Sequence, residues 1–181
     1  MKRYLLAGLA LLGLGAAFAS PARITPQSII VNPAPNPQVG VRTWVDRTSY
    51  RIGQPIRISV SVTRDAYVYL FNINADGTMT TIFPNAYGSD NFMYAGQTRT
   101  FPQSGDGFTF TVSGPVGTDR VLAVASSQQL DMTDVYNTTS GDFYDVVPSS
   151  PNNLARALSI VVQPVPSYDW VTAITSYRVR Y

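Results

Sequence analysis

Hydrophobic and polar residues alternate along most of the chain after residue 39, which is the pattern of half-buried β-strands. The clearest run is 56–62, in which every second residue is Ile or Val and the residues between them are Arg or Ser. Residues 67–73 are largely apolar on both faces, as in a central strand, and the turn 74–77 leads to a returning strand at 78–83. The same pattern predicts further strands at 41–45, 98–101, 107–112, 119–126 and 170–179.

A single segment near the C-terminus has helical periodicity instead. Ser150 is suited to cap a helix, and Pro151 fits the first turn, where an N–H has no partner within the helix. The apolar residues that follow recur at helical spacing and form one stripe: Leu154, Ala157, Leu158 and Val161. We therefore predict a short helix from residue 151, with this stripe facing the core.

Short strands at close spacing, separated by Gly, Pro, Asn and Asp, predict an all-β fold. We expect residues 39–181 to form an immunoglobulin-like antiparallel β-sandwich with one short helix near the C-terminus. The chain has no Glu and a single Lys, and the scarcity of these two helix-favouring residues agrees with a strand-rich fold. Because the sequence contains no Cys, the core alone must stabilise this domain.

The first 19 residues have the three parts of a secretory signal peptide. Lys2 and Arg3 supply positive charge, residues 5–17 are an apolar run, and Ala17-Phe18-Ala19 places small residues at a cleavage site. A retained membrane anchor is the alternative, but a helical span needs about 20 apolar residues and this run is shorter. We therefore expect cleavage after Ala19.

Residues 20–38 form a Pro- and Asn-rich stretch with one short apolar patch, Ile29-Ile30-Val31. Proline density favours an extended conformation over a helix. The segment is either a flexible linker or partly docked on the domain that follows, and the sequence leaves both open. Together with the signal peptide, this organisation predicts an exported protein of the periplasm or the cell surface.

Composition excludes most catalytic chemistry. The chain has no His, Cys or Glu, and its single Lys lies in the predicted signal peptide. Nucleophilic catalysis by Ser lacks an activating base, and transition metals lack the ligands that they prefer. An Asp-dependent hydrolase is the catalytic alternative, although no pair of Asp residues stands out. We expect no enzymatic activity, no catalytic residue and no cofactor.

The charge balance also limits the partners. The chain has 13 basic and 11 acidic residues, so loss of Lys2 and Arg3 leaves equal numbers of Arg and Asp. The Arg residues are interleaved with Asp, which argues against nucleic acid or an acidic membrane as a partner. We expect no transmembrane helix after signal removal. An outer-membrane protein that crosses the bilayer with strands is an alternative, although such strands need about 10 residues and most predicted strands are shorter.

Three groups of polar residues could be considered for calcium: Asp131 with Asp134, Asp142 with Asp145, and Asp90 with Asn91. A calcium loop brings several acidic ligands together at close spacing, and no such run is present. We expect these Asp residues to close turns instead, including a short helical turn that begins near Asp131, and we predict no metal site.

Aromatic residues in two loops are the candidate binding residues. The first loop contains Tyr87, Phe92 and Tyr94, and the second contains Tyr136, Phe143 and Tyr144. Aromatic side chains on exposed loops can stack on sugars or anchor a protein partner. They can equally fold back over the open ends of a sandwich, and the sequence does not separate these two roles. The aromatic residues within 67–71 are expected to fill the core.

An ordered series of short motifs resembles the bacterial Domain of Unknown Function 4384 family. The motifs are YRIGQPIRI at 50–58, DAYVYLFNI at 65–73, DG at 76–77, IFPN at 82–85, NFMYAG at 91–96, FP at 101–102, VLAVAS at 121–126, LD at 130–131, LARALSIVV at 154–162 and WV at 170–171. The preceding ITPQSIIVNP at 24–33 is similar to the stand-alone secreted members. The family has no established activity, and its longer relatives carry kinase-like or caspase-like modules, which implies a sensing or interaction role.

Together these observations predict a non-catalytic, exported module of the cell envelope with a binding or structural role. Its expected partner is an envelope protein or a glycan, contacted through the aromatic loops. The sequence does not identify that partner or the oligomeric state.

Overall fold

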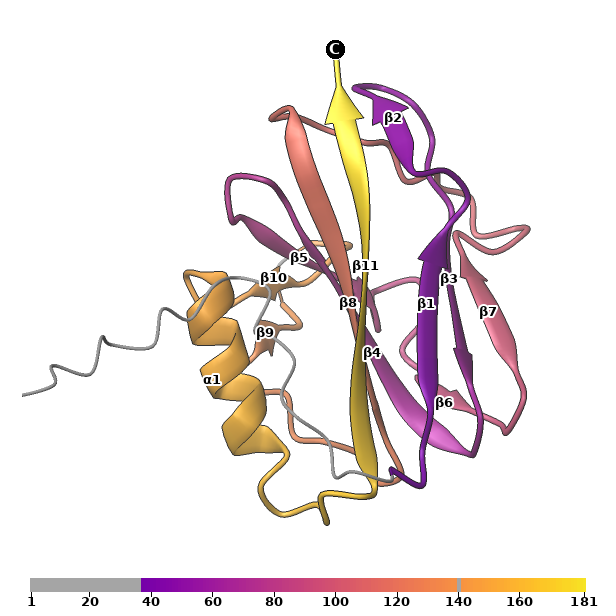
Figure 1. The fold of residues 1–181 in the computed structure, drawn as a ribbon, viewed down its shortest axis with the longest axis vertical. Helices are drawn as coiled ribbons and strands as arrows, with labels where there is room; N and C mark the ends of the chain where they lie inside the picture. Colours follow the sequence, from indigo (N-terminus) through magenta and orange to yellow (C-terminus); the bar gives the residue numbers. More distant parts are fainter. Residues whose placement is uncertain (1–36, 140) are drawn as a thin grey trace, which may run out of the picture.

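The computed structural model describes residues 37–139 and 141–181. The predicted signal peptide lies outside the described residues, as does nearly all of the segment 20–38. The described part is mostly β, with two open sheets and one helix near the C-terminus (Figure 1). This confirms a strand-rich fold with one short helix.

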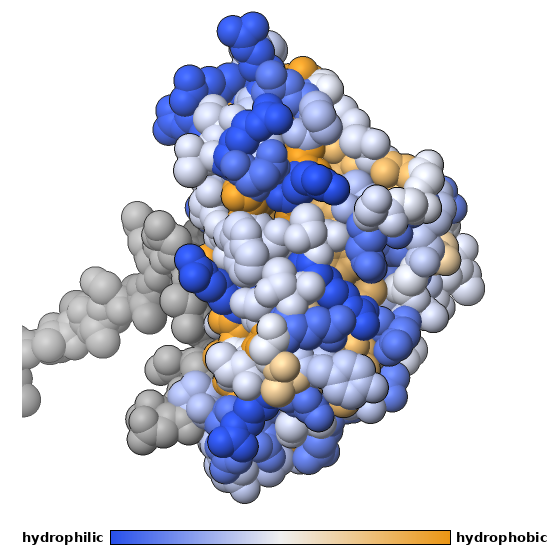
Figure 2. All heavy atoms as spheres, turned by 90° about the vertical axis from the view of Figure 1, so that its right-hand side faces the viewer, coloured by the Kyte–Doolittle hydropathy of each residue, from blue (hydrophilic) through white to orange (hydrophobic). Residues whose placement is uncertain are grey.

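The smaller sheet has three antiparallel strands, in the order β1 (Val41–Val45), β3 (Ile58–Val62) and β7 (Thr98–Phe101). Alternation in β3 places Ile58, Val60 and Val62 toward the larger sheet, where all three are buried. The outer face of this layer is largely hydrophilic, and apolar atoms show through mainly in the gaps between polar residues (Figure 2). The predicted half-buried strand is therefore confirmed.

The larger sheet has eight strands, in the order β2-β11-β8-β4-β5-β10-β9, with β6 paired to β4. In chain order these are β2 (Ser49–Arg51), β4 (Ala66–Ile73), β5 (Met79–Phe83), β6 (Phe92–Met93), β8 (Gly117–Ser126), β9 (Tyr136–Asn137), β10 (Asp145–Val146) and β11 (Trp170–Arg180). Neighbouring strands are antiparallel, except that β2 pairs with β11 in parallel. The sheet is thus not purely antiparallel.

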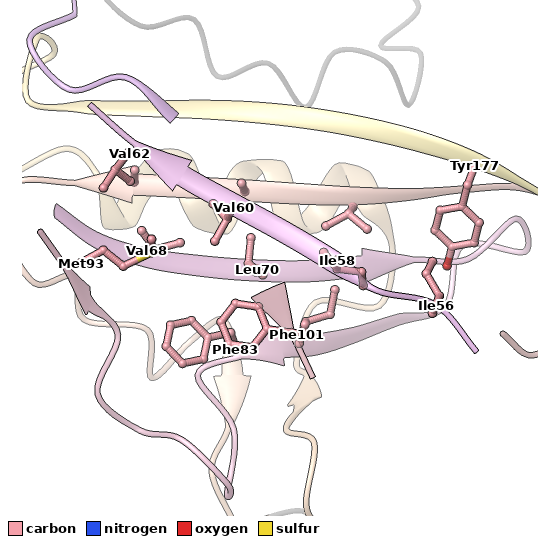
Figure 3. Close-up of a cluster of buried hydrophobic side chains, with 14 of the residues drawn as sticks. Ile56, Ile58, Val60, Val62, Val68, Leu70, Phe83, Met93, Phe101 and Tyr177 are labelled. Carbon is pink, nitrogen blue, oxygen red and sulfur yellow. The ribbon is translucent and has the colours of Figure 1, made fainter. Parts of the chain in front are cut away.

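Strand β4 shows how the larger sheet separates two cores. Val68 and Leu70 point toward the smaller sheet, and Tyr69 and Phe71 point to the opposite face. Figure 3 shows the first of these cores, where residues of β3 face Val68 and Leu70. We call it the inter-sheet core. The second, the helix-side core, is covered by helix α1 (Pro151–Val161).

Helix α1 forms where the sequence predicts it. The Ser150 hydroxyl accepts a hydrogen bond from the Asn153 N–H at 3.3 Å, and Pro151 occupies the first turn. Leu154 and Leu158 are buried against the larger sheet, while Arg156 is exposed. The predicted stripe is therefore the face that packs. As a result, the molecule has three layers, with the helix and the smaller sheet on opposite faces of the larger sheet (Figure 1).

The strand predicted at 107–112 is not present. The segment makes one isolated bridge, between Thr111 and Pro55, and Ile56 N–H donates to the Phe110 carbonyl at 3.1 Å. The Val112 N–H donates to the Gln54 carbonyl at 2.9 Å on the other side of this bridge, and the pairing does not continue into a regular strand. Phe108 and Phe110 therefore belong to a loop, in which their ring centroids are 5.3 Å apart.

Other differences concern very short elements. Strands β2, β6, β9 and β10 have two or three residues each, which is too short for period-two alternation to be recognised. The turn expected near Asp131 is present: the Asp131 carboxylate accepts from the Thr133 N–H at 3.1 Å, and the Met132 carbonyl accepts from the Tyr136 N–H at 3.0 Å. This turn packs Met132 on the helix-side core.

Candidate functional site

The structure divides the six predicted contact residues into three separate groups. Tyr87 and Phe143 come together, although they lie on different predicted loops. Phe92 and Tyr94 form a second group, and Tyr136 and Tyr144 form a third. The two loops predicted from sequence therefore do not correspond to two sites.

The first group is part of a larger cluster of four rings from three segments, which we call the aromatic cluster: Tyr87, Phe108, Phe110 and Phe143. The ring centroids of Tyr87 and Phe108 are 4.5 Å apart, and those of Phe110 and Phe143 are 5.2 Å apart. These separations are typical of favourable aromatic pairs. The three Phe rings are half-buried, whereas 50% of Tyr87 is exposed.

Local hydrogen bonds hold Tyr87 in place. The buried Asn85 side chain accepts from the Tyr87 N–H at 2.9 Å, and its own amide donates to the Ile82 carbonyl at 2.7 Å. At the other end of the ring, the Tyr87 hydroxyl donates to Asp142 Oδ2 at 2.7 Å, and this hydrogen bond raises the pKa of Tyr87. The exposed ring is therefore fixed at both ends, so little rotamer entropy is lost when it contacts a partner.

The second group surrounds the end of β4. Phe92 meets Tyr67 edge-on at 5.1 Å and Tyr94 at 5.2 Å. Tyr94 is 66% exposed, and its N–H donates to the Gln97 side chain at 2.9 Å. This group presents one exposed ring on a tight turn, so it offers a smaller apolar surface than the aromatic cluster.

The third group, Tyr136 and Tyr144, lies beside the helix-side core. Tyr136 stacks on Tyr144 at 5.6 Å and lies 6.5 Å from the Phe71 ring. Burial raises the pKa of Tyr136 to about 12. Tyr136 packs against that core, and the Tyr144 carbonyl accepts a hydrogen bond from the Thr81 N–H on β5 at 3.0 Å. These two residues fold back over the sheet, which was one of the two roles open from the sequence.

Phe108 and Phe110 were missed as site residues. Both were placed within the strand expected at 107–112 and were not considered as binding residues. The signal that could have corrected this is the density of Gly and polar residues around them, since SGDG at 104–107 favours a loop over a strand. Both Gly105 and Gly107 have positive φ angles, of 100° and 73°, which a strand does not contain.

A cavity of about 140 Å³ lies beneath the aromatic cluster and reaches between the two sheets. Phe110 and Phe143 line it and also belong to the cluster, so the cluster forms part of its rim. Its apolar walls include Ile56 and Val112, both about 4% exposed. Figure 3 shows the Tyr177 hydroxyl directed toward Ile56 at this end of the inter-sheet core.

Asp119 is the acidic group of this cavity and is 2% exposed. Its Oδ1 atom accepts from the Ala75 N–H at 2.9 Å, and the neighbouring Tyr177 hydroxyl donates to Asn72 Oδ1 at 3.1 Å. Burial raises the pKa of Asp119, because the ionised form loses water. Burial likewise raises the pKa of Tyr177, with the Asp119 charge as a further cause. The cavity therefore combines apolar walls with a few polar groups, as ligand sites do.

The Asp residues considered for calcium are spread over separate turns. Asp131 accepts hydrogen bonds from Thr133, and Asp142 accepts one from Tyr87. Within the described part of the chain, no three acidic, His or Cys residues are grouped so that they could hold a metal ion. Among the same residues, no helix has both the length and the apolar character needed to cross a membrane.

Part of the chain matches a known protein family. Residues 49–129 match the family described as Domain of unknown function (DUF4384). The chain contains a DUF4384 domain. The match confirms the resemblance for the part from β2 to just beyond β8, which includes Tyr87, Phe108, Phe110 and Asp119, whereas Phe143 follows it. No curated protein matches the chain.

Proposed function

We propose that this chain is a non-catalytic binding module of the bacterial cell envelope and that it holds a protein partner on the aromatic cluster. Export to the periplasm or the cell surface rests on the signal peptide predicted at 1–19. The absence of His, Cys and Glu from the sequence supports a role without catalysis. A structural role in the envelope, the alternative to a role in binding, would also use the aromatic cluster as the contact surface.

The observation that carries the proposal is the assembly of the aromatic cluster. Three loops that are distant in sequence bring four rings together, and the most exposed of them, Tyr87, is held at its backbone and its hydroxyl. Tyr residues are enriched among the residues that dominate the free energy of protein–protein binding. A preorganised Tyr surrounded by half-buried Phe rings supplies apolar contact area with little loss of entropy.

A glycan is the second candidate partner, because exposed aromatic faces stack on sugars. The geometry of the cluster favours a protein. The ring planes of Phe108 and Phe143 are 72° apart, and those of Phe108 and Phe110 are 68° apart, so the Phe rings cover one another's edges and faces. Tyr87 alone offers a largely exposed ring, which is too little for an extended sugar platform.

For the fold, we propose that the two sheets form an immunoglobulin-like sandwich, which would place the aromatic cluster among the loops beside its core. The shared inter-sheet core and the alternation in β3 and β4 support this arrangement. The parallel edge strand β2 and the helix over the outer face of the larger sheet are additions to it.

The test is capture of envelope proteins and of envelope glycans by the tagged protein. Variant Tyr87→Ala removes the exposed ring, and Tyr168→Ala is its control, because Tyr168 is similarly exposed, at 45%, but lies outside the cluster. We expect Tyr87→Ala to weaken capture of one protein at least about tenfold, as for a central interface Tyr. Tyr168→Ala should capture the protein as the unchanged chain does, and both variants should keep their melting temperature.

Equal capture by the two variants would contradict the proposed surface. If the chain captures a purified glycan but no protein, and this capture is lost in Tyr87→Ala, the partner is a glycan.

A further inference from the structure

The cavity beneath the aromatic cluster contains a carboxylate that forms no salt bridge within the described residues. Asp119 is 2% exposed, and no Arg side chain lines the cavity among the described residues. The Ala75 N–H donates to its carboxylate and the Tyr177 hydroxyl is hydrogen-bonded to it, and neither of these neutral groups cancels the charge. The Arg120 charge acts on Asp119 without pairing directly with it. A buried carboxylate is costly unless it is paired, so the site is suited to a cation.

The walls of the cavity limit what can carry that cation. Aliphatic and aromatic side chains supply most of their exposed area: Ile56, Ile58, Ile82, Phe110, Val112, Phe143 and Tyr177. The remaining lining residues are polar: Asn72, Asn74, Thr80, Thr81, Thr111, Ser113 and Asp119. The volume, about 140 Å³, is close to that of an engineered cavity of about 150 Å³ that takes up benzene. A short apolar chain or a single ring therefore fits, and a larger organic group does not.

The hydrogen bonding of Asp119 bears on whether its cationic partner is a guanidinium or an ammonium group. Asp119 Oδ1 already accepts from the Ala75 N–H, so a guanidinium that engages both carboxylate oxygens would share Oδ1 with that N–H. An ammonium group is a compact point charge that needs only one acceptor from the carboxylate. Its aliphatic stem would contact Phe110 and Phe143 at the rim, as the apolar stems of Lys side chains lie along apolar surfaces.

We propose that this cavity receives a primary ammonium group on a short apolar stem, and that its source is a Lys side chain of the protein partner. The inference rests on the proposed function, because the Lys enters beside the aromatic cluster that the partner covers. The ammonium group pairs with Asp119, and the partner backbone stays outside on the cluster. A cation at this position would hold Asp119 ionised, against the rise in pKa that burial causes.

Thr81 is among the residues that line the cavity, but the pairing of β4 with β5 assigns its orphaned hydroxyl to the other face of the larger sheet. Thr81 Oγ1 is buried and has no hydrogen-bond partner within the described residues. Thr81 pairs across the ladder with Phe71, which lies in the helix-side core, and directly paired residues share a face. The Thr81 side chain therefore belongs to the opposite face of the larger sheet from Asp119.

The first experiment uses n-butylammonium as the probe and n-butanol as its uncharged match, each titrated into the purified protein and followed by amide chemical shifts. We expect butylammonium to bind at least about tenfold more tightly, with shifts around Asp119, Phe110 and Tyr177. Asp119→Asn should abolish this preference, while Asp142→Asn should retain it, because Asp142 contacts Tyr87 but does not line the cavity. Equal binding of amine and alcohol, or a preference that survives Asp119→Asn, would overturn the ammonium site.

A second variant provides an independent test in case Asp119→Asn does not fold. Thr111→Trp adds bulk at an exposed position of the cavity lining and leaves the core unchanged. It should also reduce butylammonium binding at least about tenfold. Unchanged binding in this variant would place the probe elsewhere and overturn the proposal.

The source of the ammonium group is tested by acetylating the Lys residues of the envelope proteins before capture. Loss of capture by acetylation and by Asp119→Asn supports a partner Lys. If butylammonium binds but capture resists acetylation, the cavity serves a free amine and the Lys assignment is wrong. If butylammonium does not bind while capture still depends on Tyr87, the cavity inference fails and the proposed function stands.

Discussion

Buried polar groups have different surroundings on the two faces of the eight-stranded sheet. On the helix-covered face, the Tyr69 hydroxyl donates to the Leu130 carbonyl at 3.3 Å and accepts from the Leu130 N–H at 2.9 Å, so it ties the loop after β8 to the sheet. On the face covered by the smaller sheet, the carboxylate of Asp119 lies beside an open cavity. The first arrangement stabilises the fold, whereas the second leaves a buried carboxylate in the lining of a cavity.

The packing of the two faces differs in the same way. Helix α1 closes one face with Leu154 and Leu158, which are at most 1% exposed. The smaller sheet closes the other face with residues of β1, β3 and β7, and the loop that carries Phe108 and Phe110 lies at one end of it. A regular element packs continuously, whereas an irregular loop leaves space. The cavity is lined by Phe110, Thr111 and Val112, in the segment where a strand was expected.

The largest expected effect is on the helix-covered face. Leu158→Asp places an unpaired carboxylate in an apolar core and should lower the free energy of unfolding by more than about 3 kcal/mol. Arg156→Ala, on the exposed side of the same helix, should change it by no more than about 0.5 kcal/mol. Chemical denaturation of both variants makes the measurement. Similar losses in the two variants would contradict the orientation of the helix.

A smaller effect distinguishes paired from unpaired hydroxyls on that face. Tyr69→Phe leaves both backbone groups of Leu130 without their partner and should cost about 1–3 kcal/mol. Thr81→Val removes a hydroxyl that has no partner, and should be neutral within about 0.5 kcal/mol or stabilising. Denaturation curves at one pH compare the two. A larger loss in Thr81→Val than in Tyr69→Phe would reverse the interpretation.

The smallest effect is the pH dependence, which should have opposite signs for two carboxylates. Burial raises the pKa of Asp119, so its contribution to stability is full below its unfolded pKa and is lost as pH rises through the folded value. The Thr133 hydroxyl and N–H lower the pKa of Asp131, so its contribution is present above the unfolded pKa and is lost as pH falls.

Urea denaturation between pH 3 and pH 7 checks both signs. As pH rises, the free energy of unfolding of Asp119→Asn should increase relative to that of the unchanged protein. That of Asp131→Asn should decrease relative to the unchanged protein. The same slope for both variants would show that Asp119 is not desolvated in the folded state.

The sequence predicted the regular parts of the fold well, because their signals are local. Alternation located β3, a run that is apolar on both faces located β4, and a capping Ser followed by Pro located the start of α1. The very short strands were not predictable, since the larger sheet defines them by pairing rather than by their own pattern.

The candidate site was predicted only in part, because it depends on which loops meet. Tyr87 and Phe143 were named as candidates, but nothing local shows that they share a cluster with Phe108 and Phe110. Asp119 was expected only as the first residue of a strand. Its burial follows from the pairing of Asp119 with Tyr177 across β8 and β11, which join residues distant in sequence.

The most direct test of the central claim is photo-crosslinking in the living cell. A photoreactive residue at Thr109, which is exposed between Phe108 and Phe110, would contact whatever covers the aromatic cluster. The same residue at Tyr168 reports on an exposed surface away from it. The account predicts one discrete adduct with an envelope protein from position 109 and none from position 168. No adduct at either position, or the same adducts at both, would contradict it.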